Sequence, residues 1–209
     1  VGKIEDIFNH RGITQSNHTA GNRACCDATI EYLKKDRWKG LLFVNLVDTD
    51  MKYGHRRNTK DFAYCLEKFD ERLPEIMRLL GDDGLLIITA DHGCDPAFTA
   101  HTDHTRERVP LLVWGLGLQE GVDLGERKSF ADISATALEA LIDRGVKLCA
   151  ALGMYAIIDW HILSDGDPNI HADAAEDFFR RLSAKYAGRS HVLYELCNEP
   201  NGPAVTWPV

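Results

Sequence analysis

The chain has 209 residues, of which 44% are hydrophobic and 27% charged, with a formal net charge of -8. This composition is ordinary for a globular protein that buries a core, and the length suits one large domain or two small ones. The acidic balance disfavours nucleic acid as a partner, and no apolar run reaches the roughly 20 residues of a membrane span, so we expect no membrane partner.

The cysteines form no C-x-x-C pair. They are Cys25, Cys26, Cys65, Cys94, Cys149 and Cys197. Five of them fall in helix-like or strand-like segments, where a small buried thiol is the ordinary interpretation. This pattern favours a reducing cytoplasm over a disulfide framework.

Residues 23–36 predict a helix with Cys26, Ile30 and Leu33 on one face. The next segment, GLLFVNLVD at 40–48, is a continuous apolar run. Such a run is typical of a strand that is buried on both faces of a parallel sheet.

A long helix is predicted over 59–80, because apolar residues recur at three- and four-residue steps and Gly81 supplies a stop. A second helix is predicted over 129–145. Its start has Ser129 as the N-cap, and Gly145 lies just past its end.

The remaining predicted elements are strands at 84–91, 109–115, 154–163 and 191–200 and an amphipathic helix at 172–188. Strands that alternate with helices indicate right-handed parallel crossovers. The expected fold class is therefore α/β, with a parallel sheet flanked by helices followed by a strand–helix–strand unit.

Acidic and imidazole side chains gather after two of the predicted strands. The set comprises Asp50, His55, Asp91, His92 and His104. The carboxyl ends of parallel strands share one sheet edge, so these groups should converge there. Carboxylate and imidazole together suit Zn²⁺ or Mn²⁺ better than Ca²⁺. A set of this size suggests two metals, which clamp the attacking and leaving oxygens of a phosphoryl transfer.

Other candidates in the same region have simpler interpretations. Asp48 follows the first strand, and an aspartate in that position is more often a helix cap or turn residue. His10, His18 and His101 are interpreted as solvated loop residues.

Three stretches carry a family resemblance: VGKIEDIF, VNLVDTDMKYGHRRN and LLIITADHGCDPAFTAHTDHTRERVPLLVWG. From residue 1 to about 140 the chain resembles the carboxyl-terminal part of phosphopentomutases, in the alkaline phosphatase superfamily. The resemblance implies an alkaline-phosphatase-like core and interconversion of ribose or deoxyribose 1-phosphate and 5-phosphate. It also implies a sugar phosphate as the small-molecule partner, two Mn²⁺ ions (with Zn²⁺ as the alternative) and a phosphorylated threonine.

By this resemblance Asp91 and His92 hold one metal, whereas Asp50, His55 and His104 hold the other. The loop between His92 and His104 is one residue longer than the family pattern. The resemblance alone therefore does not fix the position of His104 relative to the other ligands.

The resemblance also makes Arg56, Arg57 and Arg106 candidates for binding the sugar phosphate. A guanidinium binds phosphate well in a bidentate manner, and surface salt bridging explains each residue equally well. The family's cap domain, phosphoacceptor threonine and one further metal-ligating aspartate have no counterpart in these residues. We therefore expect the isolated chain to lack mutase turnover.

From about Gly145 the sequence no longer resembles a phosphopentomutase. LGMYAIIDWHILSDGDPN and HVLYELCNEPNGPAVTW resemble family 5 glycoside hydrolases, endoglucanases built on a (β/α)₈ barrel. This resemblance implies β-glucan as a partner, with Glu199 as general acid/base, Asn198 on the sugar 2-hydroxyl and His161 as a substrate-binding residue. Taken alone, without the surrounding motifs, Glu199 is interpreted as a helix-capping or turn carboxylate before Pro200.

The sequence thus predicts two segments, a phosphopentomutase-like metal-binding core at 1–140 and a cellulase-like barrel fragment at 145–209, joined near 138–146. A natural fusion, an engineered chimera and a misassembled gene all explain such a join. Phosphopentomutase-type phosphoryl transfer is the main functional hypothesis. Glycoside hydrolysis and a non-catalytic metal-binding α/β module are the alternatives.

Overall fold

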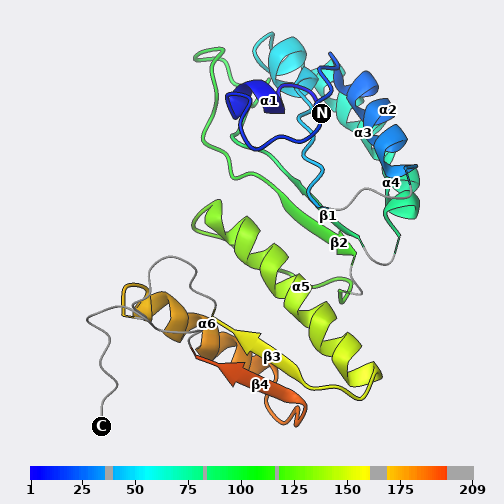
Figure 1. Ribbon diagram of the computed structural model, residues 1–209. Coiled ribbons are helices and arrows are strands. Elements are labelled where there is room, and N and C mark those ends of the chain that lie inside the picture. The colour runs from blue at the N-terminus through cyan, green and yellow to red at the C-terminus, as the bar shows by residue number, and fades with distance from the viewer. Residues whose placement is uncertain (36–39, 82–83, 116–117, 161–168, 197–209) are drawn as a thin grey trace. The chain divides into compact units, whose positions relative to one another are not determined.

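The computed structural model describes residues 1–35, 40–81, 84–115, 118–160 and 169–196. The chain forms two compact units, Val1–Val122 and Asp123–Val209 (Figure 1). Each unit has its own cluster of buried apolar side chains. Within the described ranges, no helix combines the length and the apolar character that crossing a membrane requires.

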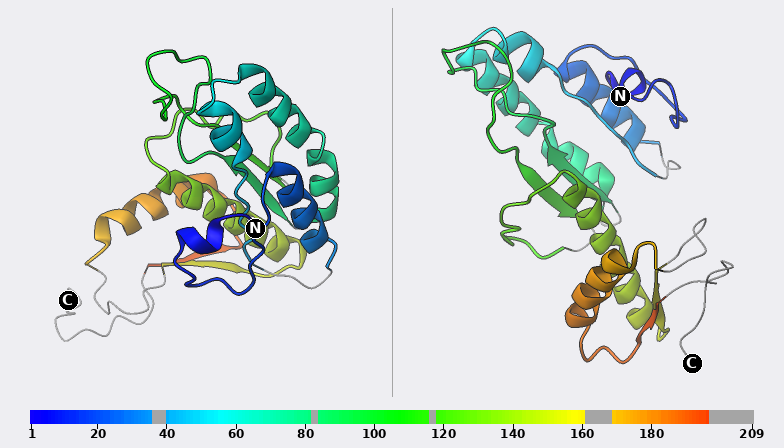
Figure 2. Two further views of the ribbon diagram at one scale, coloured as in Figure 1. Left: turned by 90° about the horizontal axis from the view of Figure 1, so that it is seen from above. Right: turned by 90° about the vertical axis from the view of Figure 1, so that its left-hand side faces the viewer.

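The first unit contains mostly helices. They are α1 (Ile4–Ile7), α2 (Asn22–Leu33), the π-helix η1 (Thr49–Gly54), α3 (Thr59–Asp70) and α4 (Leu73–Leu80). Helix α2 packs against α3 and α4 (Figure 2). Ile30 and Leu33 of α2 and Ile76 of α4 form the buried centre of this packing. Cys26 is also buried, so the predicted apolar face of α2 is confirmed.

The single helix predicted over 59–80 is two helices, so that prediction is wrong. Pro74 has no N–H to donate to the carbonyl of Asp70, and its ring would clash with that carbonyl inside a continuous helix. Helix α3 accordingly ends at Asp70, and Pro74 lies in the first turn of α4, where proline is tolerated. Gly81 ends α4 with a φ of 67°, as predicted.

Two strands lie where they were predicted, β1 (Leu85–Thr89) and β2 (Leu111–Gly115). They pair antiparallel, with Leu85 opposite Gly115, so the expected parallel pairing is wrong for these two strands. Residues 90–110, which join them, contain no helix. Antiparallel strands can be joined by a loop, whereas a parallel pair needs a crossover that is usually helical.

The predicted strand at 40–48 is also wrong, because residues 41–47 are in no strand. The amino-terminal ammonium of Val1 donates to the carbonyl of Phe43 over 2.8 Å, and the Asn45 amide donates to the Val1 carbonyl over 3.2 Å. Leu41 is 88% exposed. The segment is therefore held by the chain's first residue rather than buried on both faces of a sheet.

The second unit contains α5 (Ala131–Ala151), β3 (Ala156–Asp159), α6 (Ala172–Lys185) and β4 (Val192–Glu195). Strands β3 and β4 pair in parallel, with Ala156 opposite Val192. The predicted strand–helix–strand unit is confirmed within the described part of this segment. Helix α5 continues six residues past Gly145, so the predicted helix end there is wrong.

The core of the second unit lies on one face of its two strands. Ile158 and Val192 pack there against Phe178 and Leu182 of α6. The alternate residue Ile157 is 62% exposed, because successive side chains of a strand point to opposite faces.

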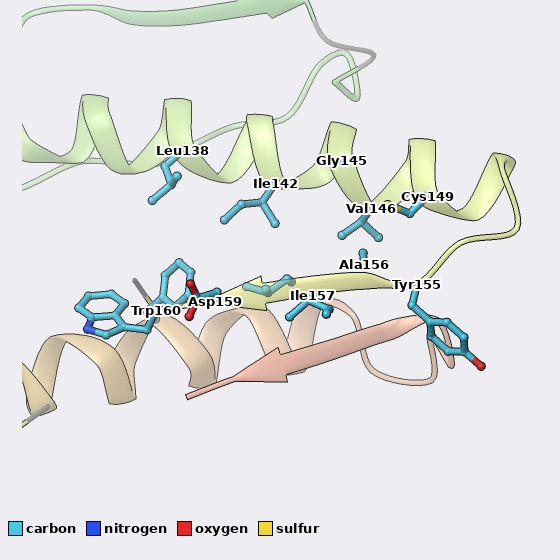
Figure 3. A pocket seen from close by; sticks show the side chains of 12 residues that line it. Leu138, Ile142, Gly145, Val146, Cys149, Tyr155, Ala156, Ile157, Asp159 and Trp160 are labelled. Atoms are coloured by element: carbon cyan, nitrogen blue, oxygen red, sulfur yellow. The ribbon is translucent and has the colours of Figure 1, made fainter. Parts of the chain in front are cut away.

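Helix α5 and strand β3 enclose an apolar pocket of about 500 Å³ (Figure 3). Leu138, Ile142 and Val146 extend from α5 toward the strand. Phe178 of α6 lines the same space. Residues of α5, β3 and α6 therefore surround one apolar space in the second unit.

Candidate metal centre

The π-helix η1 determines how Asp50 and His55 lie. The amide of His55 donates to the carbonyl of Asp50 over 3.1 Å, a bond that spans five residues. In an α-helix, residues five apart point about 140° away from each other, since each residue turns the helix by about 100°. The wider turn of a π-helix brings them to one side. The result is a distance of 3.2 Å between His55 Nε2 and Asp50 Oδ1.

His92 and His104 come from the two arms of the loop that joins β1 and β2. An isolated antiparallel bridge joins Gly93 to Thr105, directly beside the two histidines. The imidazole rings stack with centroids 3.6 Å apart and planes 18° from parallel. His104 therefore lies within reach of the cluster.

Asp50, His92 and His104 each offer a ligand atom within 4.8 Å of the others. Asp50 Oδ1 is buried and accepts no hydrogen bond from the described residues. His55 Nε2 lies 3.2 Å from that oxygen and His104 Nε2 lies 3.6 Å from it. Both nitrogens are close to the oxygen, but neither makes a hydrogen bond to it. A buried carboxylate oxygen without a partner is costly, and a cation among these groups would satisfy it. The residues therefore fit a divalent metal.

Backbone carbonyl groups hold the Nδ1 atoms of two histidines. His55 Nδ1 lies 2.5 Å from the carbonyl oxygen of Thr102, and His92 Nδ1 lies 3.1 Å from that of Gly93. A carbonyl only accepts, so each Nδ1 carries the proton when the ring is neutral. The lone pair is then on Nε2, the nitrogen that His55 directs toward Asp50. Such second contacts are typical of histidines that ligate metals.

Asp91 lies at the edge of the cluster. Its side chain is 84% exposed, and its Oδ1 is 3.7 Å from His92 Nε2. Three of the other four predicted ligands therefore lie around Asp50, and the fourth, Asp91, contacts only His92 among them.

The three predicted phosphate-binding arginines are exposed. They are Arg56, Arg57 and Arg106. Arg57 Nη2 donates to the carbonyl of Thr99 over 2.9 Å, so this side chain also ties η1 to the histidine loop.

Cys94 packs under η1 beside the cluster. A Cβ added to Gly54 would lie 2.3 Å from Cys94 Sγ, so only glycine fits there. Burial, reinforced by the nearby Asp50 carboxylate, raises the pKa of the Cys94 thiol. Sequence reasoning missed Gly54 and Cys94. The signals that could have found them are the glycine directly before His55 and the cysteine two residues after His92.

His10, His18 and His101 lie outside the cluster, as expected. His18 Nε2 lies 2.9 Å from Glu5 Oε2, and His10 lies 3.5 Å from the other oxygen of that carboxylate. Hydrogen bonds from Ser16, His18 and His10 lower the pKa of Glu5 to about 2. His101 contacts Phe98, with ring centroids 4.7 Å apart.

The predicted glycosidase residues His161, Asn198 and Glu199 lie outside the described residues. The apolar pocket of the second unit is lined by residues of α5, β3 and α6 and belongs to a different part of the chain from the histidines.

Two family models match overlapping parts of the sequence. Residues 2–143 match the metalloenzyme superfamily, and residues 108–209 match the cellulases of glycosyl hydrolase family 5. A solved structure of the cellulase Cel5C_n is 46% identical, with a TM-score of 0.31, over 40% of this chain and 25% of that one.

Phosphopentomutases are similar to the first part. One from Alkaliphilus metalliredigens is 53% identical over 141 residues, and one from Caldanaerobacter subterraneus is 57% identical over 139. These alignments cover 68% and 66% of this chain but only 36% and 35% of the relatives, so the chain spans about a third of their length. With its match over residues 2–143, the chain belongs to the metalloenzyme superfamily.

Proposed function

We propose that residues 1 to about 140 form the metal-binding part of a phosphopentomutase-type site, which transfers a phosphoryl group on ribose or deoxyribose phosphates. The observation that carries this proposal is the buried Asp50 Oδ1, which has no hydrogen-bond partner among the described residues and lies beside three imidazoles. The phosphopentomutases at 51–57% identity support the substrate class.

Two metal positions follow from the family resemblance. Asp50, His55 and His104 hold one ion, and Asp91 with His92 holds the other. We propose Mn²⁺ as the ion, and Zn²⁺ also suits this set of imidazole and carboxylate ligands. When bound, the ions polarise the phosphoryl oxygens and neutralise charge during transfer.

The chain's own residues would orient the substrate. Arg56 and Arg106 are exposed near the ligands in the sequence and are proposed to hold the sugar phosphate by paired N–H donors. Arg57 would do so only in part, since it already donates to Thr99.

A segment exchange tests this function. Residues 2–143 would replace the matching segment of the full-length Acetivibrio thermocellus phosphopentomutase, to which they are 53% identical. We expect the exchanged protein to interconvert ribose 1-phosphate and ribose 5-phosphate with added Mn²⁺, and the same exchange carrying Asp50→Ala to be inactive. A folded exchange protein without turnover would contradict the proposal.

A second candidate function comes from the cellulase match at residues 108–209. Glu199 as general acid/base, with Asn198 and His161 as sugar contacts, would act on a β-glucan. Carboxymethylcellulose hydrolysis by the chain, compared with Glu199→Gln, tests it. Metal binding without either activity would instead favour a non-catalytic metal-binding module.

We also propose that the two ancestries meet between residues 140 and 145. The metalloenzyme match ends at 143, which supports this position, and the cellulase match overlaps it from 108. The described cysteines are all free, which favours a cytoplasmic location.

A further inference from the structure

Asn22 and Asp48 bind each other reciprocally across 26 residues of sequence. The Asn22 amide donates to Asp48 Oδ2 over 2.8 Å, and the Asp48 amide donates to Asn22 Oδ1 over 2.9 Å. Both residues are buried, with 7% and 8% exposure. Two buried polar residues that satisfy each other in this way hold their two backbones in one register.

The pair is fixed on both sides. Asn22 Nδ2 lies 3.2 Å from Cys65 Sγ of α3, and Lys52 Nζ lies 3.0 Å from Asp48 Oδ1. A Cβ at Gly21 would lie 3.3 Å from Asp48 Oδ2, and Gly21 has a φ of 86°, so the α2 backbone approaches the carboxylate closely. Asp48 thus caps the first turn of α2 from a distant part of the chain.

Asp48 lies two residues before Asp50, at the residue that precedes η1. Its backbone position therefore sets where η1 begins and where the Asp50 carboxylate points. The other end of η1 is fixed separately, by His55 Nδ1 on Thr102 and by Arg57 on Thr99.

We propose that Asn22 and Asp48 are positioning residues for the metal site, which act through Asp50 by anchoring the start of η1 to the first turn of α2. This inference rests on the proposed metal site. The two side chains contact each other, Cys65 and Lys52, so their effect on metal binding passes through the backbone of residues 48–50.

The test uses the whole chain and two measurements, hydrogen exchange of the peptide that covers residues 48–58 and Mn²⁺ affinity by calorimetry. Asn22→Ala should speed exchange in that peptide and weaken Mn²⁺ binding by about tenfold or more, as for other outer contacts of metal ligands. The matched control is Thr29→Val, which removes a buried hydroxyl bond to Cys25 on the same helix. It should lower thermal stability while leaving exchange at 48–58 and Mn²⁺ affinity unchanged.

Asp48→Asn and Asp48→Ala extend the comparison. The amide oxygen of Asp48→Asn still accepts from Asn22, so this variant should stay near wild type, whereas Asp48→Ala should match Asn22→Ala. Unchanged exchange in Asn22→Ala, or an equal loss of affinity in Thr29→Val, would overturn the proposal. If the wild-type chain bound no Mn²⁺, the proposed function would fail, and the exchange measurement would still decide whether this pair orders η1.

Discussion

The hydroxyl of Tyr186, the residue that follows α6, donates a 2.5 Å hydrogen bond to Asp143 Oδ1 on α5. Lys185 Nζ lies 2.7 Å from the other oxygen of the same carboxylate. Asp143 is the last residue of the metalloenzyme match and also lies inside the cellulase match, which contains Tyr186. The Asp143 carboxylate therefore links the end of the first match to residues that only the second match covers.

Replacing Tyr186 with Phe should destabilise the second unit by roughly 1.5–3 kcal/mol, the usual range for a hydrogen bond to a charged group. Burial, reinforced by the bond to Asp143, raises the pKa of Tyr186, so the phenol stays a donor at neutral pH. Urea denaturation followed by circular dichroism measures the change. Arg180→Ala, which removes only exposed ion pairs, should change stability by less than about 0.5 kcal/mol.

Gly145→Ala should stabilise the protein by about 0.5–1 kcal/mol. Gly145 lies in the middle of α5, and an added Cβ would meet no atom within 4 Å. Alanine loses less backbone entropy than glycine in a helix. Gly153→Ala is the matched control, because its site is equally open but its φ is 67°. That variant should be destabilised by about 1 kcal/mol in thermal denaturation.

Removing His55 and His92 together should abolish Mn²⁺ or Zn²⁺ binding measured by calorimetry. The two imidazoles approach the cluster from η1 and from the loop after β1, so no single segment replaces both. His101→Ala, in the same loop but against Phe98, should bind as wild type does. Equal affinity in the double variant would place the metal elsewhere.

Leu182→Ala should cost about 2–5 kcal/mol of unfolding free energy, since Leu182 is fully buried between α6 and the β3–β4 pair. Ile157→Ala removes three carbons from the opposite, exposed face of β3 and should cost less than about 1 kcal/mol. Similar losses in the two variants would mean that the face carrying Ile157 is covered in solution.

Alkaline pH should destabilise the first unit through Cys26. Burial raises the pKa of this thiol to about 11, above the usual 9, so the folded state holds the proton more tightly. The resulting stabilisation is complete below pH 9 and is lost as pH rises from 9 to 11. The fall in melting temperature over this window should be smaller in Cys26→Ala than in wild type. Equal falls would count against the buried thiol.

Local sequence signals predicted the elements that local chemistry controls. The face of α2, the stop at Gly81 and the β3–α6–β4 unit all follow from periodicity and turn residues. Pro74 is a helix-breaking residue that the sequence shows. The apolar periodicity continues on both sides of it, so the pattern alone indicated one helix. Gly145 was misjudged because helix packing overrides its weak propensity.

Long-range contacts were out of reach of sequence reasoning. The carbonyl of Phe43 and the amide of Asn45 both bond to Val1, across more than 40 residues of sequence, and local patterns do not reveal such contacts. Asn22 was missed for the same reason, because its partner Asp48 lies 26 residues away. The clustering of Asp50, His92 and His104 was foreseeable, since carboxylate and imidazole side chains at strand ends are visible in the sequence.

The hydrogen bond from the His55 amide to the Asp50 carbonyl spans five residues, and it keeps the two side chains on one side of η1. The same residues closed as an ordinary α-helix, with bonds between residues four apart, would have more regular backbone hydrogen bonds. The His55 ring would then point about 140° away from Asp50, since each residue turns an α-helix by about 100°. In this segment, backbone regularity and the proximity of these two side chains therefore oppose each other.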